Sequence, residues 1–311
     1  MAESQLIDRR EFLDVGLKFG IGTLALGLVP SLLKASGEPE GLLILHTNDV
    51  HSRIEPFPMD GGKFQGMGGF SARAAMIDEI RKKHRNVLLF DSGDILQGTP
   101  YFNRYHGALE FRLMSEMGYN GACIGNHDFD AGIENLAHLA ESATFPLICS
   151  NYEVKGTPLE GKVKSYSVFK TGKIKTGVYG LGIELNGLVP EQLYGGIRYH
   201  NPVERAVWAE EILKKEEKCD FIICLSHLGF RYENSKVSDV VIARETSFTD
   251  LILGGHTHTF MQKPEVEENL KGKSVYVFQN GWGGVYLGCI EVGKGPKDSS
   301  KLKVLNSLSV C

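Results

Sequence analysis

From Gly41 onward, short apolar runs rich in β-branched residues alternate with longer segments of helical periodicity. This alternation is typical of an α/β layered domain. The runs that predict strands are 42–46, 87–90, 122–124, 146–149, 176–180, 221–225, 251–253, 275–278 and, after a turn, 302–305. Apolar residues recur every three or four positions in the segments that predict helices, which are 71–83, 107–117, 133–143, 203–218 and 239–245. Because there is no internal repeat or low-complexity linker, we expect one domain over residues 37–311.

Composition and charge limit the class of protein. The chain has 311 residues, of which 42% are hydrophobic, so it can bury a substantial core. Its formal charge of -4 provides no basic field to neutralise a polyanion. We therefore expect no nucleic acid polymer as a partner.

The six cysteines do not form a recognisable metal or redox motif. No CxxC pair occurs, and most of the cysteines stand inside apolar stretches. We expect buried free thiols rather than a disulfide framework.

The first 36 residues resemble a twin-arginine export signal. Arg9 and Arg10 are followed by Phe12 and Leu13, and a mildly apolar, glycine-rich run comes next. That run is too short to span a membrane, which takes roughly 20 apolar residues. We predict a periplasmic or otherwise exported protein whose membrane contact is through residues 1–36 alone. An amphipathic N-terminal helix of a cytoplasmic protein is the alternative.

Five of the predicted strands end in polar clusters. These clusters contain Asp49 and His51; Asp94; Asn126, His127 and Asp128; His227; and His256 and His258. The carboxyl ends of strands in an open α/β sheet line one crevice, so the clusters should converge. In each i, i+2 pair, an extended backbone would place both side chains on one side, within reach of one metal centre.

Convergence of so many carboxylates and imidazoles indicates a metal centre. Desolvating these groups together is costly unless cations compensate them. The predicted ligands are oxygen and nitrogen atoms without sulfur, a set that suits Mn, Fe, Zn or Mg-like ions. A single histidine or aspartate at a strand end would be more simply explained as a cap or a surface group.

The order of these clusters resembles the calcineurin-like metallophosphoesterase superfamily. Its pattern is D-x-H, G-D, G-N-H-[DE], H and G-H-x-H. Here it stands as Asp49-Val50-His51, Gly93-Asp94, Gly125-Asn126-His127-Asp128, His227 and Gly255-His256-Thr257-His258. The resemblance implies a four-layered α/β/β/α sandwich and two divalent cations.

Finer features resemble the 5′-nucleotidase branch of that superfamily. They are the stretches 46–51, 68–73, 91–94 and 125–130. This branch also includes UDP-sugar hydrolases, cyclic-nucleotide phosphodiesterases and thiosulfohydrolases. The resemblance implies hydrolysis of nucleotide-like phosphoesters, with a thiosulfohydrolase or a cyclic-nucleotide phosphodiesterase as the alternative. A binding module that has lost turnover is a third hypothesis.

The same resemblance implies a role for each polar residue. One metal would be held by Asp49, His51 and His258, with Asp94 bridging to a second metal that Asn126, His227 and His256 complete. Asp128 stands at a variable acidic position, and we expect it to bind no metal.

Two such cations can share a bridging hydroxide that attacks phosphorus. We predict that His127 donates a proton to the leaving group and that Asp130, three residues on, orients the His127 ring and raises its pKa. Alternatively, Asp130 is the N-cap of the helix that begins near Ile133.

Other residues near the predicted site are less clearly assigned. Arg73 could steer phosphate, but we expect it on a solvated helix face. Tyr101, Phe102 and Tyr105 could line the mouth of the cleft or belong to the core.

Enzymes of this branch usually carry a second, C-terminal domain with an aromatic clamp for the base and arginines for the phosphate. This chain ends about fifty residues beyond His258, with four aromatics after Phe260 and no arginine. We expect that domain and its clamp to be absent here, and a separate chain to supply it.

Overall fold

The computed structural model describes residues 41–294 and 300–310, with side chains described up to Gly293 and at Val310. The predicted signal segment, residues 1–36, and Cys311 lie outside the described residues. No helix in the described part is long and apolar enough to cross a membrane. Cys123, Cys149, Cys219, Cys224 and Cys289 are free and buried, as the sequence predicts.

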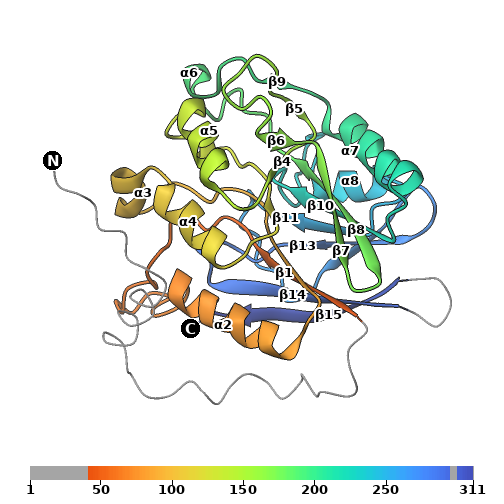
Figure 1. Ribbon diagram of the computed structural model, residues 1–311, viewed down its shortest axis with the longest axis horizontal. Helices are drawn as coiled ribbons and strands as arrows, with labels where there is room; N and C mark the ends of the chain where they lie inside the picture. Colours follow the sequence, from red (N-terminus) through yellow and green to blue (C-terminus); the bar gives the residue numbers. More distant parts are fainter. Residues whose placement is uncertain (1–40, 295–299, 311) are drawn as a thin grey trace. The chain divides into compact units, whose positions relative to one another are not determined.

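Two sheets form the centre of the domain (Figure 1). The first has the order β15-β14-β1-β2-β3-β4-β6, and its strands are β1 (Leu42–Thr47), β2 (Val87–Asp91), β3 (Gly121–Ala122), β4 (Leu147–Ile148), β6 (Val163–Lys164), β14 (Tyr286–Lys294) and β15 (Ser300–Ser309). The second has the order β12-β13-β11-β10-β8-β7, with β7 (Tyr166–Thr171), β8 (Ile174–Leu181), β10 (Phe221–Ser226), β11 (Leu251–Gly254), β12 (Glu265–Glu268) and β13 (Ser274–Phe278). A small antiparallel pair joins β5 (Tyr152–Glu153) to β9 (Arg198–Tyr199).

Helices cover the outer face of each sheet (Figure 1). On the first sheet they are α2 (Phe70–Lys83), α3 (Pro100–Tyr105), α4 (Ala108–Glu116) and α5 (Ile133–Ser142), whose apolar side chains share one core with that sheet. On the second they are α7 (Pro202–Glu211), which continues as a π-helical turn (Ile212–Glu216), and α8 (Asp239–Glu245). The short helix α6 (Glu191–Tyr194) lies before β9.

Alternation along β1 shows how the layers form. Leu43 and Leu45 pack against the helices of the first sheet, while Leu42 and Ile44 face the second sheet. A strand buried on both faces is apolar throughout, which is why residues 42–46 read as a continuous run. Three core layers therefore separate four layers of secondary structure, and the predicted α/β/β/α sandwich is confirmed.

Several element boundaries differ from prediction. The strands predicted at 122–124 and 146–149 are two-residue strands, and the helix predicted over 203–218 changes to π geometry at Ile212. Helices α3 and α6 and strands β5, β6, β7, β9, β12 and β14 were not predicted. Except for β14, which pairs with both β1 and β15, they are short or lie at sheet edges, where tertiary pairing rather than local pattern determines the structure.

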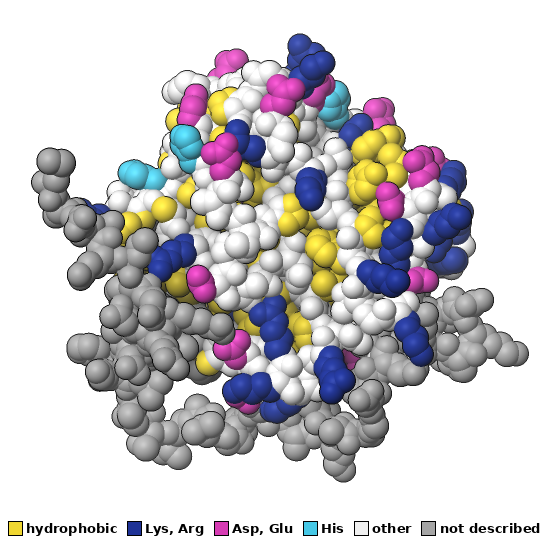
Figure 2. Space-filling model, viewed as in Figure 1, with side chains coloured by type: hydrophobic (Ala, Val, Ile, Leu, Met, Phe, Trp, Pro, Cys, Tyr) yellow, Lys and Arg dark blue, Asp and Glu magenta, His cyan; other side chains and the backbone are white. Residues whose placement is uncertain are grey.

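Charged side chains are spread over the face in Figure 2, where Lys and Arg are interspersed with Asp and Glu. This distribution agrees with the formal charge of -4.

Candidate metal centre

The predicted ligands follow the carboxyl ends of parallel strands in both sheets. Asp49 and His51 follow β1, Asp94 follows β2 and Asn126 follows β3, all in the first sheet. From the second sheet, His227 follows β10, and His256 and His258 follow β11. The structure brings them together in two groups, namely Asp49, His51 and His258, and Asp94, His227 and His256.

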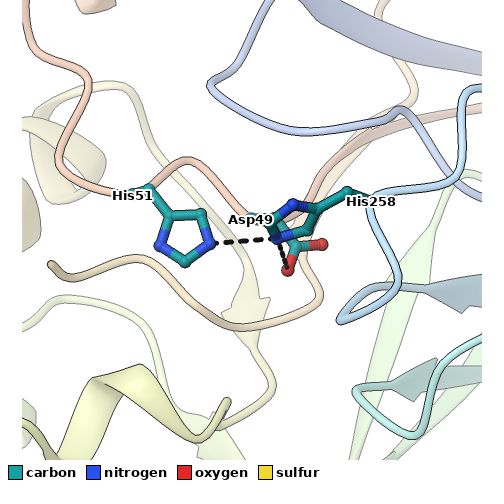
Figure 3. A group of neighbouring side chains, drawn as sticks. All are labelled: Asp49, His51 and His258. Carbon is teal, nitrogen blue, oxygen red and sulfur yellow. Dashed lines mark hydrogen bonds and ion pairs between the residues drawn. The ribbon is translucent and has the colours of Figure 1, made fainter. Parts of the chain in front are cut away.

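The first group has its polar atoms directed at one point (Figure 3). Nε2 of His51 lies 3.1 Å from Nε2 of His258, and the latter lies 3.3 Å from Oδ1 of Asp49. When both rings are neutral, only one of these two nitrogens can donate a hydrogen bond to the other. A cation between them would accept both lone pairs.

In the second group, Asp94 occupies a bridging position. Its Oδ2 lies 3.1 Å from Nε2 of His227 and 3.9 Å from Nε2 of His51, which belongs to the first group. Nδ1 of His256 lies 3.0 Å from Oδ1 of Asn126 and so places that amide beside this group. The structure thus separates six of the predicted ligands into two groups, with Asp94 between them and Asn126 beside the second.

His227 tests whether these residues fit a metal ion. Its Nδ1 lies 2.7 Å from the carbonyl oxygen of Ser92, so Nδ1 carries the proton of the neutral ring. Nε2 is buried, has no hydrogen-bond partner, and lies 3.1 Å from Oδ2 of Asp94. Such an arrangement is expected of a metal ligand held by an outer hydrogen bond. The nitrogen and oxygen donor set fits Mn, Fe, Zn or Mg-like ions.

Burial also affects the ionisation of the two histidines in the second ligand group. Burial lowers the pKa of His227, but the nearby Asp94 carboxylate outweighs it and raises that pKa to about 10. Burial and the neighbouring His227 lower the pKa of His256 to about 4. Without a cation, a proton on His227 would hence compensate Asp94, so cation and proton compete for the same place.

The backbone around the ligands is not extended, contrary to the reasoning from the i, i+2 spacing. Among the described residues other than glycine, nine have positive φ, and five of these are predicted ligands: Asp49, His51, Asp94, His256 and His258. Left-handed backbone at such residues costs free energy and is typical of functional sites. The side chains of each pair therefore reach the site through tight turns.

His127 and Asp130 form a dyad at the edge of the site. Nδ1 of His127 lies 2.8 Å from Oδ2 of Asp130, and this hydrogen bond raises the pKa of His127. The His127 backbone N–H donates to Oδ1 of Asp94 at 2.8 Å. Helix α5 has Gly132 at its N-cap, so the alternative role of Asp130 as that cap is wrong. A cavity of about 400 Å³ beside the dyad is lined by Phe102, Asn103, His106, Asp130, Ala131 and Asn135.

Asp128 has a role that the sequence did not reveal. It lies in neither ligand group, and its buried carboxylate accepts hydrogen bonds from the backbone N–H groups of Ile95, Leu96 and Gly125 at 2.8 to 3.1 Å. It also accepts a longer one from the N–H of Asp94. Asp128 therefore joins the loops that carry Asp94 and Asn126.

The expectation that Arg73 lies on a solvated face is wrong. Its side chain is fully buried, with the guanidinium carbon 4.5 Å from the centre of the Phe70 ring, and the backbone at Gly284 leaves no room above it. The weak amphipathic pattern of α2 did not show that a loop covers this position. Arg73 is thus not available to steer phosphate from solvent.

The three aromatic residues of α3 separate into core and surface. Phe102 is buried in the core of the first sheet. Tyr105 is exposed, and Tyr101 donates a hydrogen bond of 2.6 Å to Glu55.

This fold and site define a class of protein. A family model described as calcineurin-like phosphoesterase matches residues 42–260, and the chain belongs to that family. All seven predicted metal ligands of this chain, from Asp49 to His258, lie within the matched region.

Several relatives and similar structures are described as nucleotidases. The chain is 32% identical over 298 residues to the snake venom 5′-nucleotidase of Naja atra, covering 85% of this chain and 53% of that protein. It is similar to the crystal structure of a 5′-nucleotidase precursor from Thermus thermophilus, with a TM-score of 0.75, 29% identity, and coverage of 87% and 54%. A NAD nucleotidase from Haemophilus influenzae has a TM-score of 0.73 and 26% identity, with coverage of 86% and 49%. The chain thus spans about half the length of the relatives it matches.

Proposed function

We propose that the chain hydrolyses phosphoesters of nucleotide-like substrates with the help of two divalent cations. The observation that carries this proposal is the position of Asp94 between the two ligand groups, with the His127–Asp130 dyad beside it. Cations bound by Asp49, His51 and His258 and by Asn126, His227 and His256, with Asp94 shared, would neutralise phosphate oxygens and lower the pKa of the attacking water.

The dyad supplies the proton that the leaving group needs. As water adds to phosphorus and the ester bond breaks, His127 donates the proton on Nε2 to the departing oxygen. The Asp130 carboxylate accepts a hydrogen bond from Nδ1–H of His127 and so fixes the plane of the ring. The backbone hydrogen bond to Asp94 sets the position of His127 relative to the ligand groups.

The experiment is a substrate panel with the purified full chain. Phosphate release from AMP and UDP-glucose and cleavage of a chromogenic phosphodiester are measured after chelation and again with Mn²⁺. We expect activity on at least one nucleotide substrate only with the metal. Full activity in metal-free protein, or turnover of a thiosulfate ester but of no phosphoester, would contradict the proposal.

We further propose export by the twin-arginine route, supported by Arg9 and Arg10 and by the downstream glycine-rich run. Replacing both arginines with lysine should leave the precursor in the cytoplasm. Unchanged periplasmic activity in that double variant would exclude this route.

We also propose that base recognition comes from a domain outside these 311 residues. This proposal is supported by the length of the relatives, of which the chain spans about half.

A further inference from the structure

Trp282 packs against one face of His258, a ligand histidine that is partly exposed to solvent. The ring centres of Trp282 and His258 are 5.9 Å apart, and the rings are nearly parallel at 17°. The His258 side chain is 39% exposed, whereas that of His227 is fully buried. Since the surrounding protein encloses His258 less than His227, its ring contacts limit its motion, namely the stacked indole and the His51 ring, whose centre lies 5.1 Å away.

The two histidines are held in different ways. Nδ1 of His227 is fixed by its hydrogen bond to the Ser92 carbonyl. Within the described part of the chain, no hydrogen bond to Nδ1 of His258 is present. A ligating histidine usually has such an outer partner, which fixes the direction of the ring. In His258, stacking on Trp282 fixes the direction of the ring instead of a hydrogen bond, because rotation about Cβ–Cγ would drive the ring edge into the indole.

The loop that carries Trp282 is tied to the first ligand group. The N–H of Gly283 donates to the carbonyl oxygen of Asp49 at 2.7 Å. Nδ2 of Asn48 donates to the carbonyl oxygen of Gly281 at 2.7 Å and to Oδ2 of Asp49 at 2.6 Å. The buried Asn48 amide thus holds the Asp49 carboxylate and the Trp282 loop in one arrangement.

A second aromatic ring supports the indole from another side. Phe57 meets Trp282 edge-on, with ring centres 5.4 Å apart at 89°. A ring held between two partners on a tethered loop has few alternative rotamers, so it can act as a rigid wall for His258.

We propose that Trp282 is a positioning residue for the first ligand group, which sets the direction in which His258 presents Nε2 to a cation. The inference rests on the proposed function, because it requires that Asp49, His51 and His258 bind a metal.

The experiment measures Mn²⁺ binding to the metal-free full chain by electron paramagnetic resonance. Wild type should bind two ions. Trp282→Leu should weaken one of the two sites by a factor of about 10 to 100, as expected for loss of an outer-shell partner. Trp282→Phe keeps a ring against His258 and should restore most of that affinity. Trp282→Met, which is apolar but has no ring, should behave like Trp282→Leu and provides a second variant if leucine disturbs folding.

Two controls locate the effect. Tyr286→Leu removes a ring from the far side of the same aromatic cluster, where Tyr286 meets Phe260 edge-on at 5.9 Å, and should leave both sites unchanged. The site weakened by Trp282→Leu should be the one that His258→Ala removes, and the double variant should lose no more than His258→Ala alone.

The possible results separate the inference from the proposed function. If wild type does not bind two ions, the proposed metal centre is wrong. If wild type binds two and Trp282→Leu binds both as tightly, or if Tyr286→Leu weakens binding equally, the positioning role of Trp282 is wrong.

Discussion

His127 shows how one residue can be close to a metal centre without being a ligand. Its backbone N–H contacts Asp94, but its ring is directed by Asp130. We expect His127→Ala to lower kcat by a factor of about 10² to 10⁴, the usual contribution of a positioned acid. Because the ring belongs to neither ligand group, metal content should stay at two ions per chain. Steady-state kinetics with elemental analysis checks both values, and loss of metal in this variant would mean that His127 is a ligand.

For single residues, the sequence predicts which side chains form the site better than it predicts their backbone conformation and burial. All seven predicted ligands converge because the ends of parallel strands meet at one edge, a rule that needs no coordinates. The left-handed backbone at Asp49 and His256 was not foreseen, since nothing in the local pattern requires it. The burial of Arg73 and the four amide contacts of Asp128 depend on loops distant in sequence.

At the scale of elements, Asp250 joins β10 and β11 at the ends opposite to the ligands. Its carboxylate accepts a hydrogen bond of 2.9 Å from the N–H of Ile222, and burial raises the pKa of Asp250 to about 6. A carboxyl whose pKa is raised on folding binds its proton more tightly in the folded state. Its contribution to the free energy of unfolding is therefore greatest below about pH 4 and is lost as the pH rises to about 6.

We expect Asp250→Asn to remove this dependence. Relative to the variant, wild type should lose up to about 3 kcal/mol between pH 4 and pH 6, an upper value from a shift of about two pH units. Urea unfolding of both proteins at several pH values measures the difference. Parallel stability curves would show that Asp250 has an ordinary pKa in the folded protein.

Several long elements were predicted within a few residues because their apolar periodicity is local, whereas the two longest strands, β14 and β15, were missed or predicted too short. The helix predicted over 133–143 is observed as α5, Ile133–Ser142, and the strand at 221–225 is observed within β10. By contrast, β3 and β4 have only two residues each and are defined by the neighbours they pair with. Such elements have no period of their own to detect.

For the whole molecule, the proposal that base recognition lies elsewhere leads to a kinetic prediction. Stacking of a base between aromatic rings contributes roughly 1 to 3 kcal/mol, so on this proposal residues 1–311 alone should bind nucleotides about one to two orders of magnitude more weakly than a protein that includes the base-recognition domain. We expect AMP, UMP and a simple aryl phosphate to be hydrolysed with similar kcat/KM. A strong preference for one base with micromolar KM, and with no added protein, would show that these 311 residues complete the cleft.

The left-handed backbone at the ligand residues serves the site but lowers the stability of the fold. Each such residue lowers stability by roughly 1 to 2 kcal/mol relative to glycine, so the site is maintained at the expense of the fold. We expect His51→Gly to raise the melting temperature of metal-free protein while it removes a metal ligand. A fall in that temperature, measured by calorimetry, would mean that the His51 side chain stabilises more than its backbone strains. If this cost is real, these residues should be replaced first in a lineage that no longer needs catalysis, because each replacement by glycine would increase the stability of the fold.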